Sequence, residues 1–234
     1  WREVVTQHDC DVLVSAHRAA DSWVLVWSRD AAHDLEVRHA DGTPWTAVQI
    51  AGPVAVTEVH ARPSSSEVFV GTVAFTRPLA VHRIDVSGKA PTVTDLPPVG
   101  AAPLPAVTVH AGASATALTA QPAATGYSGA TALTVQSAVT AQRRHATSAD
   151  GTRVPMTVLR RAVLPPAEQG PRPTLLYGYG GFDIPVLSEF RTIFAAWVAA
   201  GGVLAVANLR GGGEFGAQWH QAVMLANKQN VFDD

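Results

Sequence analysis

The stretch Leu176–Phe182 reads Leu-Tyr-Gly-Tyr-Gly-Gly-Phe, and it continues the short apolar run Thr174–Tyr177. We interpret this run as a buried strand that ends at Gly178. Three glycines at the end of a strand indicate a sharp backbone turn where another group approaches closely. Ligands of parallel sheets bind at the carboxyl ends of the strands. A tyrosine held there is therefore a candidate to donate its phenolic proton to a developing oxyanion. The alternative is a packed aromatic turn without chemistry.

A second glycine-rich stretch, Val206–Gly216, reads Val-Ala-Asn-Leu-Arg-Gly-Gly-Gly-Glu-Phe-Gly. It continues Val203–Ala207, an apolar run that predicts a strand buried on both faces. Between the two stretches, Ser188–Ala200 has apolar residues at helical spacing, and a further short helix is predicted over Ala217–Ala226. Strand, helix, strand and helix in this order predict an α/β layer with a parallel sheet.

Two polar residues of the second stretch and one on the helix after it are predicted to be structural. Arg210 and Glu214 flank the three glycines, and we expect them to pair across the loop. His220 follows on the short helix and has no nucleophile partner in the sequence around it. Gly211–Gly213 does not predict a phosphate loop, because the lysine and hydroxyl residues of that motif are absent.

The first 90 residues predict short strands without helices. Turn signals such as Asp41-Gly42 recur at the spacing of roughly 8–12 residues that is typical of sandwiches, barrels and propellers. At about 40–50 residues a blade, this part would hold two blades of a propeller. The predicted strands are Ser22–Trp27, Asp34–His39, Trp45–Ile50, Val54–His60, Glu67–Phe75 and Leu79–Val86.

The composition changes twice after this β-rich part. Residues 91–136 are rich in Pro, Ala, Thr and Gly, and we interpret them as the end of the β domain plus a connection. From residue 137 onward, Val139–Thr147 and Val154–Ala162 predict a hairpin around the turn at Asp150-Gly151. We therefore expect two domains, one over residues 1–136 and one over residues 137–234.

Several classes of protein are excluded by composition and motifs. The net charge of −2 argues against a nucleic-acid partner. Cys10 is the single cysteine, so an internal disulfide and a CxxC site are impossible. No apolar run reaches the roughly 18–20 residues of a membrane span. No HExxH or Walker A motif is present, so neither a metal nor a cofactor is predicted. No G-x-S-x-G nucleophile elbow is present either.

The two glycine-rich stretches, in this order and spacing, resemble the prolyl oligopeptidase family, and the similarity extends over about residues 137–234. The resemblance implies a fold in which the last blades of a β-propeller are followed by the N-terminal part of an α/β-hydrolase domain. Tyr179 matches the family tyrosine whose hydroxyl forms half of the oxyanion hole. Phe182 matches an aromatic wall of the pocket for proline.

The same resemblance implies a serine-type endopeptidase that cleaves short proline-containing peptides after proline. It implies no cofactor, no nucleic-acid or membrane partner, and a monomeric full-length protein, which we expect in the cytoplasm. The family's nucleophile elbow would follow Asp234, so we expect this chain to be a fragment that is inactive alone. One alternative is a non-catalytic, propeller-containing peptide-binding protein. A lipase or esterase of the same superfold is a second alternative, although the strand end is not of their HGGG type.

Overall fold

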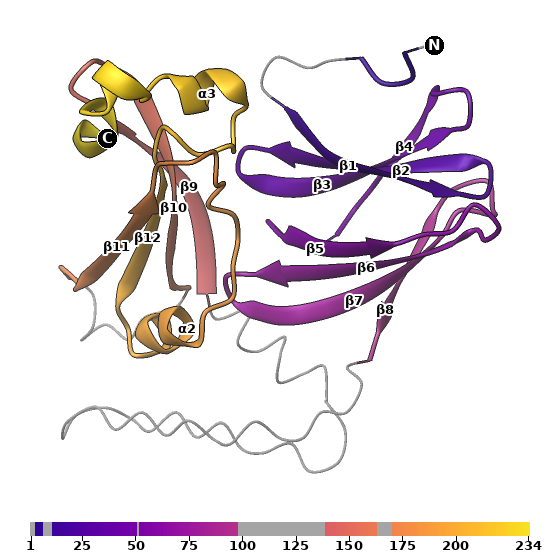
Figure 1. The fold of residues 1–234 in the computed structure, drawn as a ribbon. Coiled ribbons are helices and arrows are strands. Elements are labelled where there is room, and N and C mark those ends of the chain that lie inside the picture. Colours follow the sequence, from indigo (N-terminus) through magenta and orange to yellow (C-terminus); the bar gives the residue numbers. More distant parts are fainter. Residues whose placement is uncertain (1–2, 7–10, 51, 98–138, 163–169) are drawn as a thin grey trace.

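The computed structural model describes residues 3–6, 11–50, 52–97, 139–162 and 170–234, and within them three four-stranded sheets (Figure 1). The first two sheets are antiparallel meanders with strand orders β1-β2-β3-β4 and β5-β6-β7-β8. The first comprises β1 (Val12–Ala19), β2 (Ser22–Arg29), β3 (Ala32–His39) and β4 (Pro44–Val48). The second comprises β5 (Ala55–His60), β6 (Glu67–Ala74), β7 (Arg77–Asp85) and β8 (Thr92–Leu96).

The two meanders pack against each other through one apolar core (Figure 1). Alternate residues of each strand point inward, as the period of two in a β-strand requires. Val26 and Val37 belong to the first sheet, Val70 and Ile84 to the second, and all four are at most 1% exposed. The β-rich character predicted for the first 90 residues is thereby confirmed.

Six of these eight strands were predicted, with ends that differ by up to two residues, and two were missed. β1 carries His17 and Arg18 between small residues, and much of it lies at the surface, so its apolar alternation is weak. β8 lies within the Pro- and Thr-rich part of the sequence and has four exposed residues out of five. Each of them is hydrogen-bonded to a neighbouring strand, β1 to β2 and β8 to β7.

The third sheet has the strand order β11-β12-β10-β9. It comprises β9 (Val139–Thr147), β10 (Arg153–Arg161), β11 (Thr174–Tyr179) and β12 (Val203–Asn208). β9 and β10 form the predicted antiparallel hairpin, and β11 and β12 pair in parallel as predicted. β12 is buried along nearly its whole length, because it lies between β11 and β10 and is covered on both faces.

The helices are shorter than predicted. α2 (Thr192–Ala199) begins four residues after the expected start and buries Phe194 and Val198 against the sheet. The helix predicted over Ala217–Ala226 is wrong beyond Gln221: α3 covers Ala217–Gln221, and a 3-10 turn covers Leu225–Asn227. Leu225 has a φ of +52°, which a continuous α-helix does not allow. α4 (Asn230–Asp233) follows.

The β meanders and the third sheet share apolar contacts. Phe75 lies in the turn between β6 and β7, yet it packs with Leu159, Phe194 and Leu204 in the core of the third sheet. The connection predicted over residues 91–136 lies mostly outside the described residues, as do the expected boundary at residue 136 and Cys10.

Candidate active site

Tyr179 and Asn208 lie side by side at the carboxyl ends of the parallel strands β11 and β12, where they are paired in register. Tyr179 is 39% exposed, and its hydroxyl has no hydrogen-bond partner among the residues that the structure describes. A phenolic hydroxyl can both donate and accept a hydrogen bond. The role of Tyr179 as an oxyanion donor stays a prediction.

Position 180, in the turn after Tyr179, requires glycine because the two glycine-rich stretches touch there. A Cβ on Gly180 would overlap the carbonyl oxygen of Arg210 and the side chain of Val231. Lys228 Nζ donates to the Gly180 carbonyl oxygen at 3.1 Å from the opposite side. The close approach inferred from the glycines is therefore an approach of backbone to backbone within the protein.

Phe182 projects from this turn with 84% of its surface exposed. Phe182 and Asp183 both have left-handed backbone conformations, with φ of +54° and +58°. For a phenylalanine this conformation is strained, and such strain persists only where neighbouring contacts fix the backbone. One of these contacts is the hydrogen bond from Asp183 N to the Gly211 carbonyl oxygen, at 3.1 Å.

A buried polar cluster of Asn208, Glu214 and Val186 fixes the rest of this loop. Asn208 Nδ2 donates to the Val186 carbonyl oxygen at 2.7 Å and to Glu214 Oε1 at 3.1 Å. Glu214 Oε1 also accepts from Val186 N at 2.7 Å. Both backbone groups of Val186 are thereby satisfied by side chains of the second glycine-rich stretch. Burial raises the pKa of Glu214, while the hydrogen bonds from Val186 and Asn208 oppose that shift.

The predicted pair of Arg210 and Glu214 is wrong. Arg210 instead donates to Asp234 through Nε at 2.9 Å and Nη2 at 2.5 Å, and to Asp150 through Nη1 at 2.5 Å. It also contacts Ser148. Asp150 lies in the hairpin turn and Asp234 directly follows α4. Neither is close to Arg210 in sequence, so spacing could not reveal them.

The charges of this cluster shift the pKa of both carboxylates. Hydrogen bonds from Arg210 and Thr152 lower the pKa of Asp150 to about 2. Burial would raise the pKa of Asp234, but the hydrogen bonds from Arg210 outweigh it and the pKa is lowered. Both carboxylates are therefore ionised at neutral pH, and Arg210 joins the β9–β10 turn to the last helix.

His220 has the structural role that the sequence predicted. Its Nδ1 lies 2.8 Å from the Gly211 carbonyl oxygen, which can only accept, so Nδ1 carries the proton. The same carbonyl accepts from Asp183 N. His220 therefore helps to hold the loop against which the turn at Phe182 and Asp183 rests.

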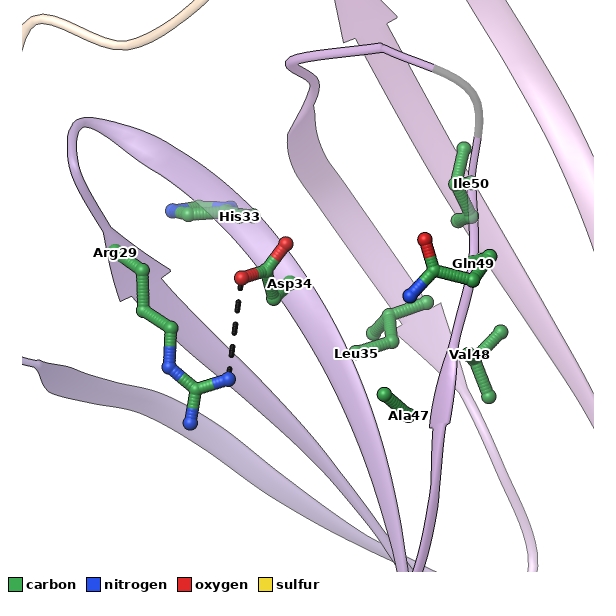
Figure 2. Close-up of a pocket in the computed structure, with 8 residues that line it drawn as sticks. All are labelled: Arg29, His33, Asp34, Leu35, Ala47, Val48, Gln49 and Ile50. Carbon is green, nitrogen blue, oxygen red and sulfur yellow. Dashed lines mark ion pairs between the residues drawn. The ribbon is translucent and has the colours of Figure 1, made fainter.

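A separate shallow cavity of about 90 Å³ lies in the first meander, on β3 and the segment that follows it (Figure 2). It is lined by Arg29, His33, Asp34, Leu35, Ala47, Val48, Gln49 and Ile50. Arg29 and Asp34 face each other across it, with a charged nitrogen and oxygen 3.8 Å apart. None of the predicted site residues lines this cavity, so it does not bear on their chemistry.

The described residues contain neither a metal-binding cluster nor a membrane-spanning helix. No group of three or more His, Cys, Asp or Glu side chains in residues 3–6, 11–50, 52–97, 139–162 and 170–234 is placed to hold a metal ion. No helix within those same ranges has both the length and the apolar character that crossing a membrane requires.

Comparison with known proteins relates the chain to one peptidase family. Residues 188–234 match the model of the prolyl oligopeptidase family. Over 88 residues the chain is 47% identical to a prolyl endopeptidase of Elizabethkingia miricola, an alignment that covers 38% of this chain and 12% of that protein. Over 95 residues it is 45% identical to an uncharacterised peptidase of Sinorhizobium fredii, covering 40% and 13% of the two chains.

Solved structures extend the similarity to the β meanders. A prolyl endopeptidase from a study of two such enzymes and their inter-domain dynamics superposes on 100% of this chain with a TM-score of 0.73 and 30% identity. Prolyl oligopeptidase B of Galerina marginata covers 99% with a TM-score of 0.74 and 20% identity. This chain spans 29% and 28% of those two structures. The predicted fold class, propeller blades followed by the start of an α/β-hydrolase domain, is confirmed.

Proposed function

We propose, from the premise that this chain belongs to the prolyl oligopeptidase family, that it is part of a serine-type endopeptidase that cleaves short peptides after proline. The observation that carries the proposal is the position of Tyr179 and Phe182. Tyr179 has an exposed hydroxyl at the end of a parallel strand, and Phe182 has an exposed ring three residues further along the chain.

The proposed reaction is acyl transfer. A serine hydroxyl adds to the prolyl carbonyl carbon, a histidine takes its proton, and the carbonyl oxygen becomes an oxyanion. The Tyr179 hydroxyl donates a hydrogen bond to that oxyanion, together with a backbone N–H. When the tetrahedral adduct collapses, the histidine returns the proton to the leaving amine, and water later hydrolyses the acyl-enzyme. We assign the serine, aspartate and histidine to sequence beyond this chain.

Phe182 is the proposed wall of the proline pocket. A flat apolar ring fits the pyrrolidine ring through shape and dispersion. The left-handed backbone at Phe182 and Asp183, held by Gly211, fixes the direction of the ring before a substrate arrives. Such preorganisation reduces the ordering cost of binding.

The relatives indicate the kind of substrate. Prolyl oligopeptidase B of Galerina marginata is described in complex with a 35-residue substrate for hydrolysis and macrocyclisation. For this chain we propose flexible proline-containing peptides, bound between the α/β domain (residues 137–234) and the propeller domain (residues 1–136). A monomeric full-length protein and a cytoplasmic location stay predictions.

A non-catalytic peptide-binding protein is the second candidate, because the described residues contain the proposed oxyanion donor without a nucleophile elbow. The experiment that separates the two candidates is a single gel of the native source. The extract is labelled with a fluorescent serine-directed phosphonate, and the same lanes are probed with an antibody to residues 1–234.

A labelled antibody band at about three times the mass of this chain, as the covered fractions of its relatives lead us to expect, supports the peptidase. An unlabelled band near 24.5 kDa instead supports the binding protein. The isolated chain should hydrolyse no proline peptide, and turnover that survives rigorous purification would contradict this assignment.

A further inference from the structure

Arg143 lies on β9, which follows β10 at the end of the strand order of the third sheet as the structure describes it (Figure 1). Its side chain contacts both parts of the molecule. Its Nε and Nη2 atoms donate to Asp30 Oδ1 at 3.0 and 2.8 Å. Its Nη1 atom donates to Asn208 Oδ1 at 2.9 Å and to Thr157 Oγ1 at 3.1 Å. One guanidinium thus joins the β2–β3 turn of the first meander to the carboxyl end of β12.

The turn that carries Asp30 has a defined conformation. Asp30 and Ala31 have left-handed φ angles of +47° and +56°, as the central residues of tight hairpin turns require. The Asp30 side chain is 65% exposed, whereas that of Arg143 is 23% exposed. Removing the Asp30 charge therefore leaves no buried group unpaired, and the turn can fold without it.

From Arg143 the contacts continue inward to the loop that carries Phe182. Asn208, which accepts from Arg143, is 2% exposed and donates to Val186 O and Glu214 Oε1. Because Arg143 occupies the amide oxygen, the amide nitrogen of Asn208 is left to face Val186 and Glu214. Flipping the amide would place an NH₂ group against the guanidinium and a carbonyl oxygen against Val186 O.

We propose that Arg143 is a positioning residue that couples the propeller blade at Asp30 to the Phe182 loop (residues 180–190) through Asn208. This inference rests on the proposed function, since it assigns a role in binding the proline peptide. When the Asp30 contact is present, Arg143 holds the Asn208 amide in the orientation that fixes Val186, and the loop presents Phe182 to substrate. When the contact is lost, the guanidinium is restrained from one side only and the loop becomes less ordered.

A purely structural ion pair would behave differently. Exposed pairs contribute little to stability and lose their effect in salt. The coupling instead predicts a change in substrate binding with little change in melting temperature.

The variants Asp30→Asn and Arg143→Gln test the coupling in the longest natural protein that contains this chain, with Arg144→Gln as matched control. Arg144 is exposed on the same strand, where it donates to Gln142.

Two readouts are measured on these proteins. Hydrogen–deuterium exchange of peptides covering residues 180–190 should be about threefold to tenfold faster in Asp30→Asn and Arg143→Gln, within the range of coupling through packed networks. For a proline peptide, KM should rise by a similar factor while kcat changes by less than about twofold, because uniform binding is lost. Arg144→Gln should match the wild type in both.

The experiment distinguishes failure of the proposed function from failure of the coupling through Arg143. If the wild type cleaves no proline peptide, the proposed function is wrong, while exchange at residues 180–190 still tests the coupling. If Asp30→Asn and Arg143→Gln show the wild-type exchange rate at residues 180–190, the coupling is wrong whatever the activity. Equal effects of Arg143→Gln and Arg144→Gln on exchange and KM would also overturn it.

Discussion

The Arg210 guanidinium contacts the Asp234 carboxylate through both Nε and Nη2, and the Asp234 side chain is completely buried. Breaking a buried pair by removing one partner costs about 3–5 kcal/mol, because the other charge is left uncompensated. Arg210→Met should therefore lower the free energy of unfolding by that amount in urea denaturation. Arg153→Met makes the same chemical change at an exposed position of β10 and should stay within about 0.5 kcal/mol of the wild type.

The dependence of stability on pH should change sign in that variant. In the wild type, Asp150 has a pKa of about 2 and that of Asp234 is lowered, against 3.8 in the unfolded chain. The stability that these two carboxylates contribute is therefore present above pH 3.8 and is lost as the pH falls toward about 2. In Arg210→Met, buried Asp234 lacks its cation and its pKa should rise, so stability should increase on acidification. An unchanged slope of unfolding free energy against pH would show that the pair does not control it.

Gly180 and Gly181 should differ in their tolerance of a methyl group. A Cβ at Gly180 would overlap the Arg210 carbonyl oxygen and Val231, whereas the atom nearest to a Cβ at Gly181 is Tyr179 Oη at 3.6 Å. Gly180→Ala should cost about 1–3 kcal/mol, the usual penalty of overpacking. Gly181→Ala should stay close to the wild type. Equal melting temperatures of the two variants would mean that the glycine-rich stretches do not touch as described.

The fold should tolerate loss of the Glu214 charge but not loss of its side-chain carbonyl oxygen. Glu214 Oε1 accepts from Val186 N and Asn208 Nδ2, and a glutamine offers the same acceptor. Glu214→Ala leaves Val186 N unsatisfied and should cost about 1–3 kcal/mol. Because burial raises the pKa of Glu214, the stability linked to its protonation is present below the unfolded pKa of 4.5 and is lost as the pH rises through the higher folded pKa, so Glu214→Gln should flatten that decline. Urea denaturation of the wild type and both variants at several pH values above 4.5 measures this. Equal destabilisation by Glu214→Gln and Glu214→Ala, or an unchanged pH slope in Glu214→Gln, would contradict it.

Local patterns predicted the parallel sheet, the β9–β10 hairpin and six of the eight meander strands, because each depends on periodicity within about ten residues. They could not predict Arg210 with Asp150 and Asp234, or Arg143 with Asp30 and Asn208. These contacts join elements far apart in the sequence. The sequence offered one indication of a role for Asn208, because it is a polar residue at the end of an apolar strand. It offered none for Arg143.

Tyr179→Phe isolates the proposed oxyanion donor. The phenol is partly exposed and has no partner among the described residues, so its loss should leave the melting temperature unchanged. In the full-length enzyme, kcat should fall by about 10–10³-fold, as loss of one oxyanion donor does. KM should change little, because the interaction forms in the transition state. An unchanged kcat would remove Tyr179 from the mechanism.

Cleavage mapping tests the central claim most directly. The full-length natural protein is incubated with a short peptide that contains one internal proline, and with the same peptide carrying alanine in its place, and the products are identified by mass spectrometry. We predict a single cut on the carboxyl side of the proline, abolished by a serine-directed phosphonate, and no cut in the alanine peptide. Equal cleavage of both peptides, or cleavage elsewhere, would contradict a prolyl-specific peptidase with Phe182 in its pocket.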